Sequence, residues 1–172
     1  IAAESVLFDM YYMAKDPVVL AGEKREPPKV EFKAVDESTP QFRNFYFRNI
    51  TCNGASKGIF LRGIPEMHVK NVLIENAVLQ ADEGIDIQEA TDIALNNITM
   101  ISKNTNPVTY ILNSNNITIN NLKYKDQSEV LAQVQGDRTN AIAILNTDTA
   151  KAKQKLVANF GSTDATVAWE EV

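Results

Sequence analysis

Apolar and polar residues alternate along much of the chain, and one alternating run recurs four times. Each copy starts with Asn or Asp, continues as apolar–x–apolar, and carries an Asn five positions after its first residue. Successive copies begin 27, 21 and 24 residues apart. Alternation of this kind predicts a strand with one buried face. The copies are Asn44–Asn49, Asn71–Asn76, Asp92–Asn97 and Asn116–Asn121.

A second short run of apolar and β-branched residues follows each copy, which predicts two strands in every period. A period near 24 residues indicates one structural unit that is repeated along the chain. We therefore predict an all-β parallel β-helix, in which each period forms one coil and stacked coils share a continuous core. The second runs are Gly58–Leu61, Gly84–Ile87, Val108–Leu112 and Val130–Val134.

Two other folds have similar spacings. A leucine-rich repeat of this length carries regular Leu residues and often a helix, whereas no helical pattern separates these strands. A sandwich of short antiparallel strands also fits the strand spacing, but it gives no reason for the Asn positions to repeat. In a β-helix the equivalent Asn residues stack on one another, and their amides can hydrogen-bond along the ladder.

The whole chain, 1–172, is predicted to form a single β-helix domain. Residues Ser5–Tyr12 alternate and are predicted to form a strand. Residues 16–41 then break the pattern and contain four of the six prolines. A long irregular stretch in a compact domain is typical of a functional or disordered segment, so we predict a loop that projects from between coils.

The coils are predicted to run over residues 42–143, and residues 147–172 are predicted to form a C-terminal cap. An Ala- and Lys-rich run predicts a short helix over Thr149–Leu156. Ala165–Trp169 is predicted to be a last strand that covers the open end of the stack, because an uncovered coil is an exposed sheet edge.

The composition of the chain disfavours several classes of binding partner. The net charge is −5, which disfavours nucleic acid and anionic membranes as partners. The single Cys52 can form no internal disulfide and has no partners for a metal site, so we expect a small buried apolar residue. No apolar run approaches the length that spans a bilayer. The chain begins at Ile1 without a Met, which suggests a mature protein or a piece of a longer one.

Four blocks of the sequence resemble one family. The blocks are Ser-Val-Leu-Phe-Asp-Met-Tyr-Tyr-Met-Ala-Lys-Asp-Pro at 5–17, Gly-Glu-Lys-Arg-Glu-Pro-Pro-Lys-Val at 22–30, Thr-Pro-Gln-Phe-Arg-Asn-Phe-Tyr-Phe-Arg-Asn-Ile-Thr-Cys-Asn-Gly-Ala at 39–55 and Gly-Ile-Phe-Leu-Arg-Gly-Ile-Pro-Glu-Met at 58–67. The chain is similar in these blocks to the C-terminal part of the family 28 glycoside hydrolases, the polygalacturonase (pectinase) family, in the form carried by Bacteroidetes. The resemblance implies a right-handed parallel β-helix and the hydrolysis of α-galacturonosyl or related pectic bonds with inversion.

The family's catalytic groups are not found in this sequence. Inversion needs one carboxylic acid to protonate the leaving oxygen and one carboxylate to activate water. The resemblance implies that these come from Asn-x-Asp, Asp-Asp, Gly-His-Gly and Arg-x-Lys motifs on coils that precede the matched region. We therefore expect no catalytic residue in this chain, and we expect the chain alone to be inactive. Its one histidine, His68, has no neighbouring carboxylate pattern and is expected at a coil corner.

A catalytic-looking stretch occurs at 81–87, where Glu83 falls at the position of a catalytic Asp of the family. Carboxylates on one strand can raise one another's pKa and form an acid–base pair. However, Ala81 replaces the family's Asn, and no Asp-Asp pair follows one coil later. We interpret Asp82 and Glu83 as solvated turn residues and place Asp86 on the outer face of its strand.

One substrate-binding residue is carried over from the resemblance. The family has a Tyr that contacts the sugar beside the scissile bond, and in register it falls on Tyr12. Aromatic rings suit sugars because the apolar face of a pyranose stacks on them. Tyr11 points to the opposite face, and both tyrosines can instead be packing residues. The charged run at 23–26 is expected to be a solvated loop, although its Lys and Arg could bind uronate carboxylates.

Two function classes remain open. The first is the C-terminal β-helix segment of a pectin-degrading hydrolase, secreted or periplasmic and without a cofactor or metal, whose partner is a pectic polysaccharide or oligosaccharide. The second is a non-catalytic β-helical module that binds acidic polysaccharide or acts as a scaffold. If coils are missing before Ile1, the first strand has a bare edge, so the isolated chain is expected to self-associate through its open N-terminal coil.

Overall fold

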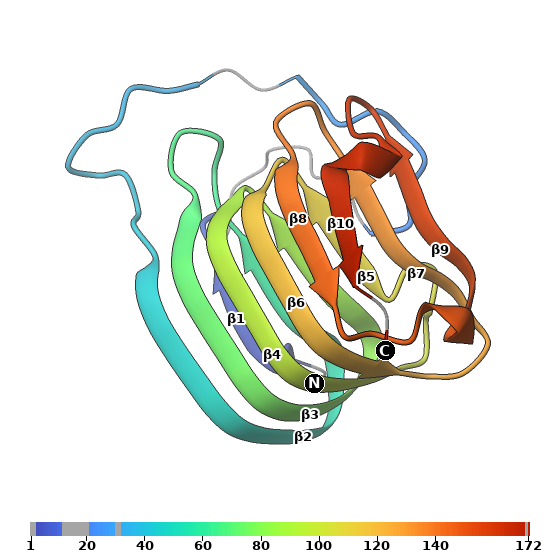
Figure 1. The fold of residues 1–172 in the computed structure, drawn as a ribbon. Helices are drawn as coiled ribbons and strands as arrows, with labels where there is room; N and C mark the ends of the chain where they lie inside the picture. The colour runs from blue at the N-terminus through green and yellow to red at the C-terminus, as the bar shows by residue number, and fades with distance from the viewer. Residues whose placement is uncertain (1–2, 12–20, 30–31, 171) are drawn as a thin grey trace.

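The computed structural model describes residues 3–11, 21–29, 32–170 and 172, and these residues form a parallel β-helix (Figure 1). The chain winds through about five coils of about 24 residues, which confirms the fold that the repeat predicts. The strands are β1 (Val6–Asp9), β2 (Arg43–Arg62), β3 (Val69–Gln88), β4 (Ala90–Ser102), β5 (Thr109–Leu112), β6 (Asn115–Tyr124), β7 (Ser128–Gln135), β8 (Asn140–Leu145), β9 (Ala152–Asn159) and β10 (Val167–Glu170). Two 3-10 helices, η1 (Thr149–Lys151) and η2 (Asp164–Thr166), lie near the C-terminus.

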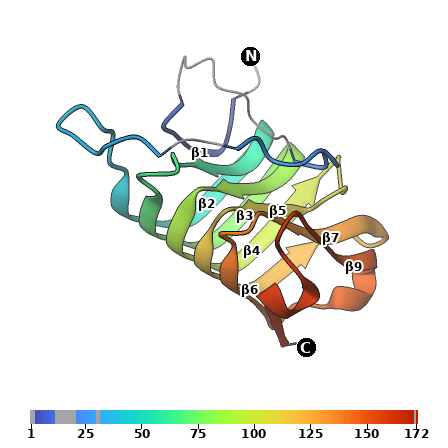
Figure 2. The same cartoon turned by 90° about the horizontal axis from the view of Figure 1, so that it is seen from above.

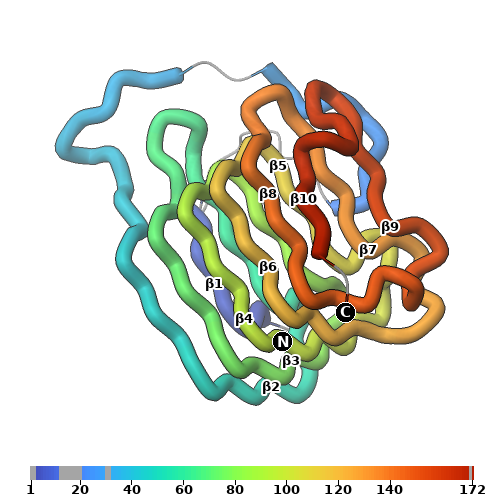
Figure 3. Tube along the Cα trace, in the orientation of Figure 1, coloured from blue at the N-terminus to red at the C-terminus, as the bar shows by residue number. Residues whose placement is uncertain are grey.

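The strands form two parallel stacks that share β2 and β3. One stack runs β2-β3-β4-β6-β8-β10, and the other runs β1-β2-β3-β5-β7-β9. β3 belongs to both because its first part pairs with β4 and its last four residues pair with β5. Figure 3 shows the long strands bending from one stack into the other along the backbone trace. The two strands predicted in each period therefore correspond to the two stacks.

Apolar side chains point inward in columns that run along the axis of the helix. Each column takes one residue from each coil, and the register of the pairs brings these residues together. Burying these side chains away from water is the main favourable contribution to folding. Two columns of nearly solvent-free residues are Val72, Ile93, Ile117 and Ile142, and Ile74, Leu95, Ile119 and Ile144.

The repeated Asn and Asp residues form the corners of the coils. Both ends of every copy have a positive φ, between 52° and 65°, in the left-handed region that Asn and Asp tolerate better than other residues with a Cβ. Their side chains also bond from coil to coil, as expected. Asn97 Nδ2 donates to Asn76 Oδ1 at 2.8 Å, and Asn121 Nδ2 donates to Asn97 Oδ1 at 3.1 Å. The Asn and Asp residues are thus repeated because the left-handed corners favour them and because their side chains form a hydrogen-bonded ladder.

We expect Asn97→Ala to lower the free energy of unfolding by about 2–4 kcal/mol. Ala pays about 1–2 kcal/mol for a left-handed backbone, and the two ladder bonds are worth roughly 0.5–1 kcal/mol each at this exposed site. Asn97→Gly keeps the backbone conformation and loses only the ladder, so it should cost about 1–2 kcal/mol. Urea denaturation of both variants measures the difference. Equal losses would show that the corner conformation contributes nothing.

The first edge of the β-helix is uncovered in the part of the chain that the structure describes. Residues 43–53 of β2 pair with β3 on one side and with no described strand on the other. Phe45 and Tyr46 are exposed there. The Phe8 ring closes this end of the core, with centroids 4.6–5.9 Å from the rings of Phe42, Phe45 and Phe47. An edge of this length is a template for pairing with another strand.

The C-terminal cap differs from the prediction of a helix. Within Thr149–Leu156 only η1 is helical, with Asp148 Oδ1 accepting a hydrogen bond from Ala150 N at 3.1 Å, and the rest of this segment belongs to β9. β9 pairs with β7 at the end of one stack, so pairing outweighs the helix propensity of Ala and Lys. The predicted last strand is present as β10, which pairs with β8.

The predicted loop at 16–41 lies only partly away from the coils. Its residues 32–41 are mostly exposed and extend away from the coils (Figure 1). Its residues 21–29 run over the outer face of the β5-β7 side, as Figure 2 shows from above, and Ala21 packs against Tyr110 and Leu112 there. We call residues 21–29 the strap. The strap covers a sheet face that carries apolar as well as polar side chains, and this explains why it does not project.

Candidate functional site

One corner of the coils departs from the Asn pattern. This corner consists of the residues that directly follow the last paired residues of β2, β3, β5, β7 and β9. Glu89 has a φ of 46° and Phe160 a φ of 53°, although neither residue type favours the left-handed region. Such conformations cost free energy and cluster at functional sites. We call this the Glu89 corner, formed by Gly63, Glu89, Asn113, Gly136 and Phe160.

Glu89 is the centre of an ionic network that joins four coils. Its carboxylate is buried, and Oε1 accepts hydrogen bonds from Arg138 Nη2 at 2.5 Å and Asn113 Nδ2 at 2.9 Å. Oε2 lies 3.3 Å from His68 Nε2. The sequence around His68 shows no carboxylate pattern, but the coil places Glu89 beside it although the two are far apart in the sequence. The network fixes the Arg138 guanidinium at the corner.

Gly136 makes room for this network. A Cβ at Gly136 would lie 2.1 Å from Asn113 Oδ1, and its φ is 94°. Only glycine therefore fits between the Asn113 amide and the turn that carries Asp137 and Arg138. The turn is short, so the two charged residues stand at the rim of the corner.

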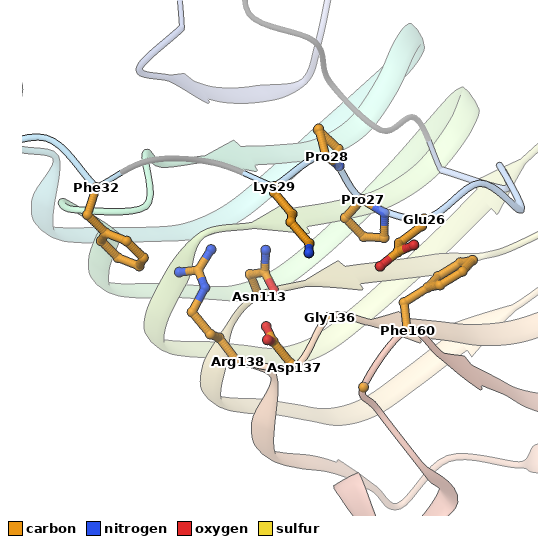
Figure 4. A pocket seen from close by; sticks show the side chains of 11 residues that line it. Glu26, Pro27, Pro28, Lys29, Phe32, Asn113, Gly136, Asp137, Arg138 and Phe160 are labelled. Atoms are coloured by element: carbon orange, nitrogen blue, oxygen red, sulfur yellow. The ribbon is translucent and has the colours of Figure 1, made fainter.

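A groove of about 580 Å³ lies between the strap and this corner (Figure 4). Its volume falls within the range of small-molecule sites. The strap contributes one wall and the coil corners contribute the other. The lining residues are Glu26, Pro27, Pro28, Lys29, Phe32, Asn113, Gly136, Asp137, Arg138, Phe160 and Gly161.

The strap is held by two glutamines on β7. Gln133 Nε2 and Gln135 Nε2 donate to the carbonyl oxygen of Glu23 at 3.0 and 3.3 Å. Gln135 Oε1 accepts from the buried Tyr110 hydroxyl at 3.0 Å, and burial raises the pKa of Tyr110. Tyr110 therefore stays neutral and donates. This anchor sets where residues 26–29 cross the groove.

The groove combines charges of both signs with aromatic rings. Lys29 and Arg138 supply two cations, and Glu26 and Asp137 supply two carboxylates. Phe160 and Phe32 add two rings, and the Arg138 guanidinium lies 5.1 Å from the centroid of Phe32. Such a surface can bind a molecule that carries one anion, several hydroxyls and an apolar face.

The catalytic-looking stretch at 81–87 lies outside the groove. Asp86 does lie on the outer face of β3, but it is only 2% exposed, which the sequence did not predict. Lys57 Nζ lies 2.6 Å from Asp86 Oδ2 and 3.1 Å from Glu83 Oε2. Burial raises the pKa of Asp86, and Lys57 and a hydrogen bond from Gln88 offset only part of this effect. Asp82 is exposed, with Lys103 Nζ at 2.6 Å. These contacts indicate structural ion pairs.

The structure describes some, but not all, of the other residues that the sequence analysis singled out. Tyr12 lies outside the described residues. Arg62 lies 5.3 Å from the ring centroid of Tyr11, which therefore has a packing partner. Of the charged run 23–26, only Glu26 lines the groove. Cys52 is partly buried against the core, close to the expectation.

Sequence reasoning missed most of the groove. Asp137 and Arg138 follow a glycine directly after a predicted strand, which is a signal for a polar turn at a coil corner. Nothing in the sequence showed that Lys29 crosses the same corner, because that contact depends on the path of the strap. Phe160 lay in a region predicted to follow a helix.

Comparison with known proteins gives no relative. No protein-family model, curated protein or solved structure matches the chain. Within the described ranges, no group of three His, Cys, Asp or Glu side chains could hold a metal ion. Likewise, no helix in these ranges has the length and hydropathy needed to cross a bilayer.

Proposed function

We propose that the chain is the C-terminal β-helix segment of a glycoside hydrolase that cleaves α-galacturonosyl or related pectic bonds by inversion. The observation that carries the proposal is the parallel β-helix. The four sequence blocks resemble family 28 glycoside hydrolases, the resemblance implies this fold, and the chain adopts it. Pectic polymers lie outside the bacterial cell, so we place the protein in the periplasm or outside the cell.

In this proposal the catalytic carboxylates belong to coils before Ile1. The uncovered edge of β2 supports the idea, because a preceding coil would pair with residues 43–53 and cover the Phe8 ring group. The chain would then complete the stack and form one wall of the substrate cleft. Alone, it would release no sugar.

The alternative is a non-catalytic module that binds acidic polysaccharide. The groove favours this alternative, since its two cations and two rings belong wholly to the described chain. The two functions share a ligand and differ in chemistry. The coding region upstream of Ile1 discriminates between them. If it encodes Asn-x-Asp, Asp-Asp, Gly-His-Gly and Arg-x-Lys motifs, the hydrolase is supported. If it does not, the hydrolase proposal is wrong.

Calorimetric titration of the unchanged chain tests the ligand that both functions share. The titrants are an α-1,4-linked galacturonate oligosaccharide and its uncharged galactose counterpart of equal length. We expect saturable binding of the acidic oligosaccharide and at least tenfold weaker binding of the neutral one. Equal binding of both, or binding of neither, would contradict a module that binds acidic polysaccharide by itself.

We also expect the isolated chain to self-associate. The unpaired backbone groups along residues 43–53 and the exposed rings of Phe45 and Tyr46 form a surface that another strand can cover. Sedimentation velocity over a concentration series measures the association. A charge at the edge, as in Phe45→Lys, should weaken it. A monomer at high concentration would rule the association out.

A further inference from the structure

We propose that the groove is a subsite for one carboxylate-bearing sugar of an acidic polysaccharide, in which Lys29 and Arg138 bind the carboxylate and Phe160 contacts the sugar ring. The proposal rests on the proposed function for its choice of an acidic sugar. It adds the place of binding and the contacts. Since this site contains no coil before Ile1, binding there needs only the chain itself.

The two cations flank the Asn113 amide at the centre of the groove (Figure 4). Lys29 is exposed and has no carboxylate partner in the part of the chain that the structure describes. Arg138 is held by Glu89, and a guanidinium carries five N–H donors, so it can bind Glu89 and a ligand carboxylate together. A ligand carboxylate between Lys29 and Arg138 would contact the Lys29 ammonium group and the Arg138 guanidinium, which Glu89 holds in place.

The two carboxylates of the groove limit what else can bind. Glu26 and Asp137 are exposed and accept hydrogen bonds, which suits sugar hydroxyls. The same carboxylates repel a ligand with several closely spaced negative charges, such as an oligophosphate. The charge pattern therefore fits a ligand with one anionic group and several hydroxyls on each unit.

Phe160 provides an apolar surface at a position that disfavours it. Its left-handed backbone is costly for an aromatic residue, and most of the other non-glycine residues with a positive φ are Asn. The Phe160 side chain lines the groove at the end where Glu26 lies, away from the Arg138 end (Figure 4). A pyranose presents an apolar face, and an aromatic ring packs against it. This contact gives the groove a preference for sugars over small inorganic anions.

Three substitutions test the subsite by NMR titration with tri-galacturonate. Lys29→Gln removes the cation that has no carboxylate partner among the described residues, and Phe160→Asn removes the ring while keeping a residue that tolerates the left-handed corner. We expect each to weaken binding about tenfold, as loss of a charge-assisted hydrogen bond or a ring contact does. Lys24→Gln makes the same charge change on the strap outside the groove, and should leave affinity within about twofold.

The outcomes separate the subsite from the proposed function. Unchanged affinity in both Lys29→Gln and Phe160→Asn, or binding of inorganic phosphate as tight as that of tri-galacturonate, would overturn the subsite. If the longer protein hydrolyses polygalacturonate while these variants bind normally, the subsite is wrong and the function stands. If the variants lose binding and the longer protein is inert, the subsite stands and the hydrolase function falls.

Discussion

Lys57→Met should lower the free energy of unfolding by about 3–5 kcal/mol, because it leaves the Asp86 carboxylate buried without its cation. Only 3% of the Asp86 side chain and 14% of the Lys57 side chain are exposed. Burial lowers the pKa of Lys57, but the charges and hydrogen bonds of Asp86 and Glu83 outweigh it, so that the pKa is raised. Lys57 thus remains charged and is the main partner of Asp86. Chemical denaturation at neutral pH measures the loss.

The loss should shrink as the pH falls. Burial raises the pKa of Asp86 in the folded chain above its ordinary value of 3.8, and removing Lys57 raises it further. A carboxyl with a raised folded pKa contributes stability below its unfolded pKa and loses that contribution as the pH rises through its folded pKa. The free energy of unfolding of Lys57→Met should therefore approach that of the unchanged protein as the pH falls toward the ordinary Asp pKa of 3.8. A loss that is constant with pH would contradict a charged, buried Asp86.

Lys103→Met is the matched control. Lys103 also pairs with an aspartate of β3, Asp82, but both side chains are largely exposed. Surface pairs of this kind are worth less than about 1 kcal/mol. Equal effects of Lys57→Met and Lys103→Met would show that burial of the Asp86 pair adds nothing.

Gly84→Ala should destabilise the chain by about 3 kcal/mol through a clash between coils. A Cβ at Gly84 would lie 2.0 Å from the backbone oxygen of Val108 on the next coil, and a backbone oxygen cannot move aside without shifting that coil. Thermal unfolding followed by circular dichroism measures the loss. An unchanged midpoint would contradict this close approach.

Gly58→Ala is the comparison, since Gly58 and Gly84 occupy the same column of neighbouring coils. A Cβ at Gly58 would lie 2.5 Å from Met100 Sδ, the far end of a flexible side chain, and 3.2 Å from the backbone oxygen of Gly84 on the next coil, a much looser approach than the 2.0 Å at Gly84. Methionine adapts to such crowding, so the cost should be about 1 kcal/mol. Equal losses in the two variants would locate the cost in something other than contact with the next coil.

The Lys57–Asp86 ion pair and the close approach of the coils at Gly84 explain why residues 81–87 resemble a catalytic motif. Gly84 is present because the coils approach closely, and Asp86 is present with Lys57 as a buried ion pair. Both features belong to the coil itself. The sequence showed the carboxylates but could not show that Lys57, one coil earlier, lies between Asp86 and Glu83.

The fold was predictable because its signals are local and repeated. The alternation fixed the strands, and the Asn and Asp residues fixed the corners, where the left-handed backbone needs them. Prediction failed where a tertiary contact outweighs a local preference. Residues 152–156 have a helical composition, but they form β9 because β7 offers an edge to pair with.

The site was less predictable because its residues come from distant parts of the chain. Lys29 and Arg138 line the same groove, and Gln133 and Gln135 hold the strap there at the carbonyl of Glu23. The partnership of His68 with Glu89 likewise depends on the register between coils. No spacing along the sequence carries this information.

Reducing-sugar release from polygalacturonate tests the central claim most directly. The assay compares the 172-residue chain with the protein that the complete reading frame encodes. We predict release by the protein of the complete reading frame and none by the chain alone, because our proposal assigns the catalytic carboxylates to coils before Ile1. An inert longer protein, or hydrolysis by the 172-residue chain itself, would contradict the account.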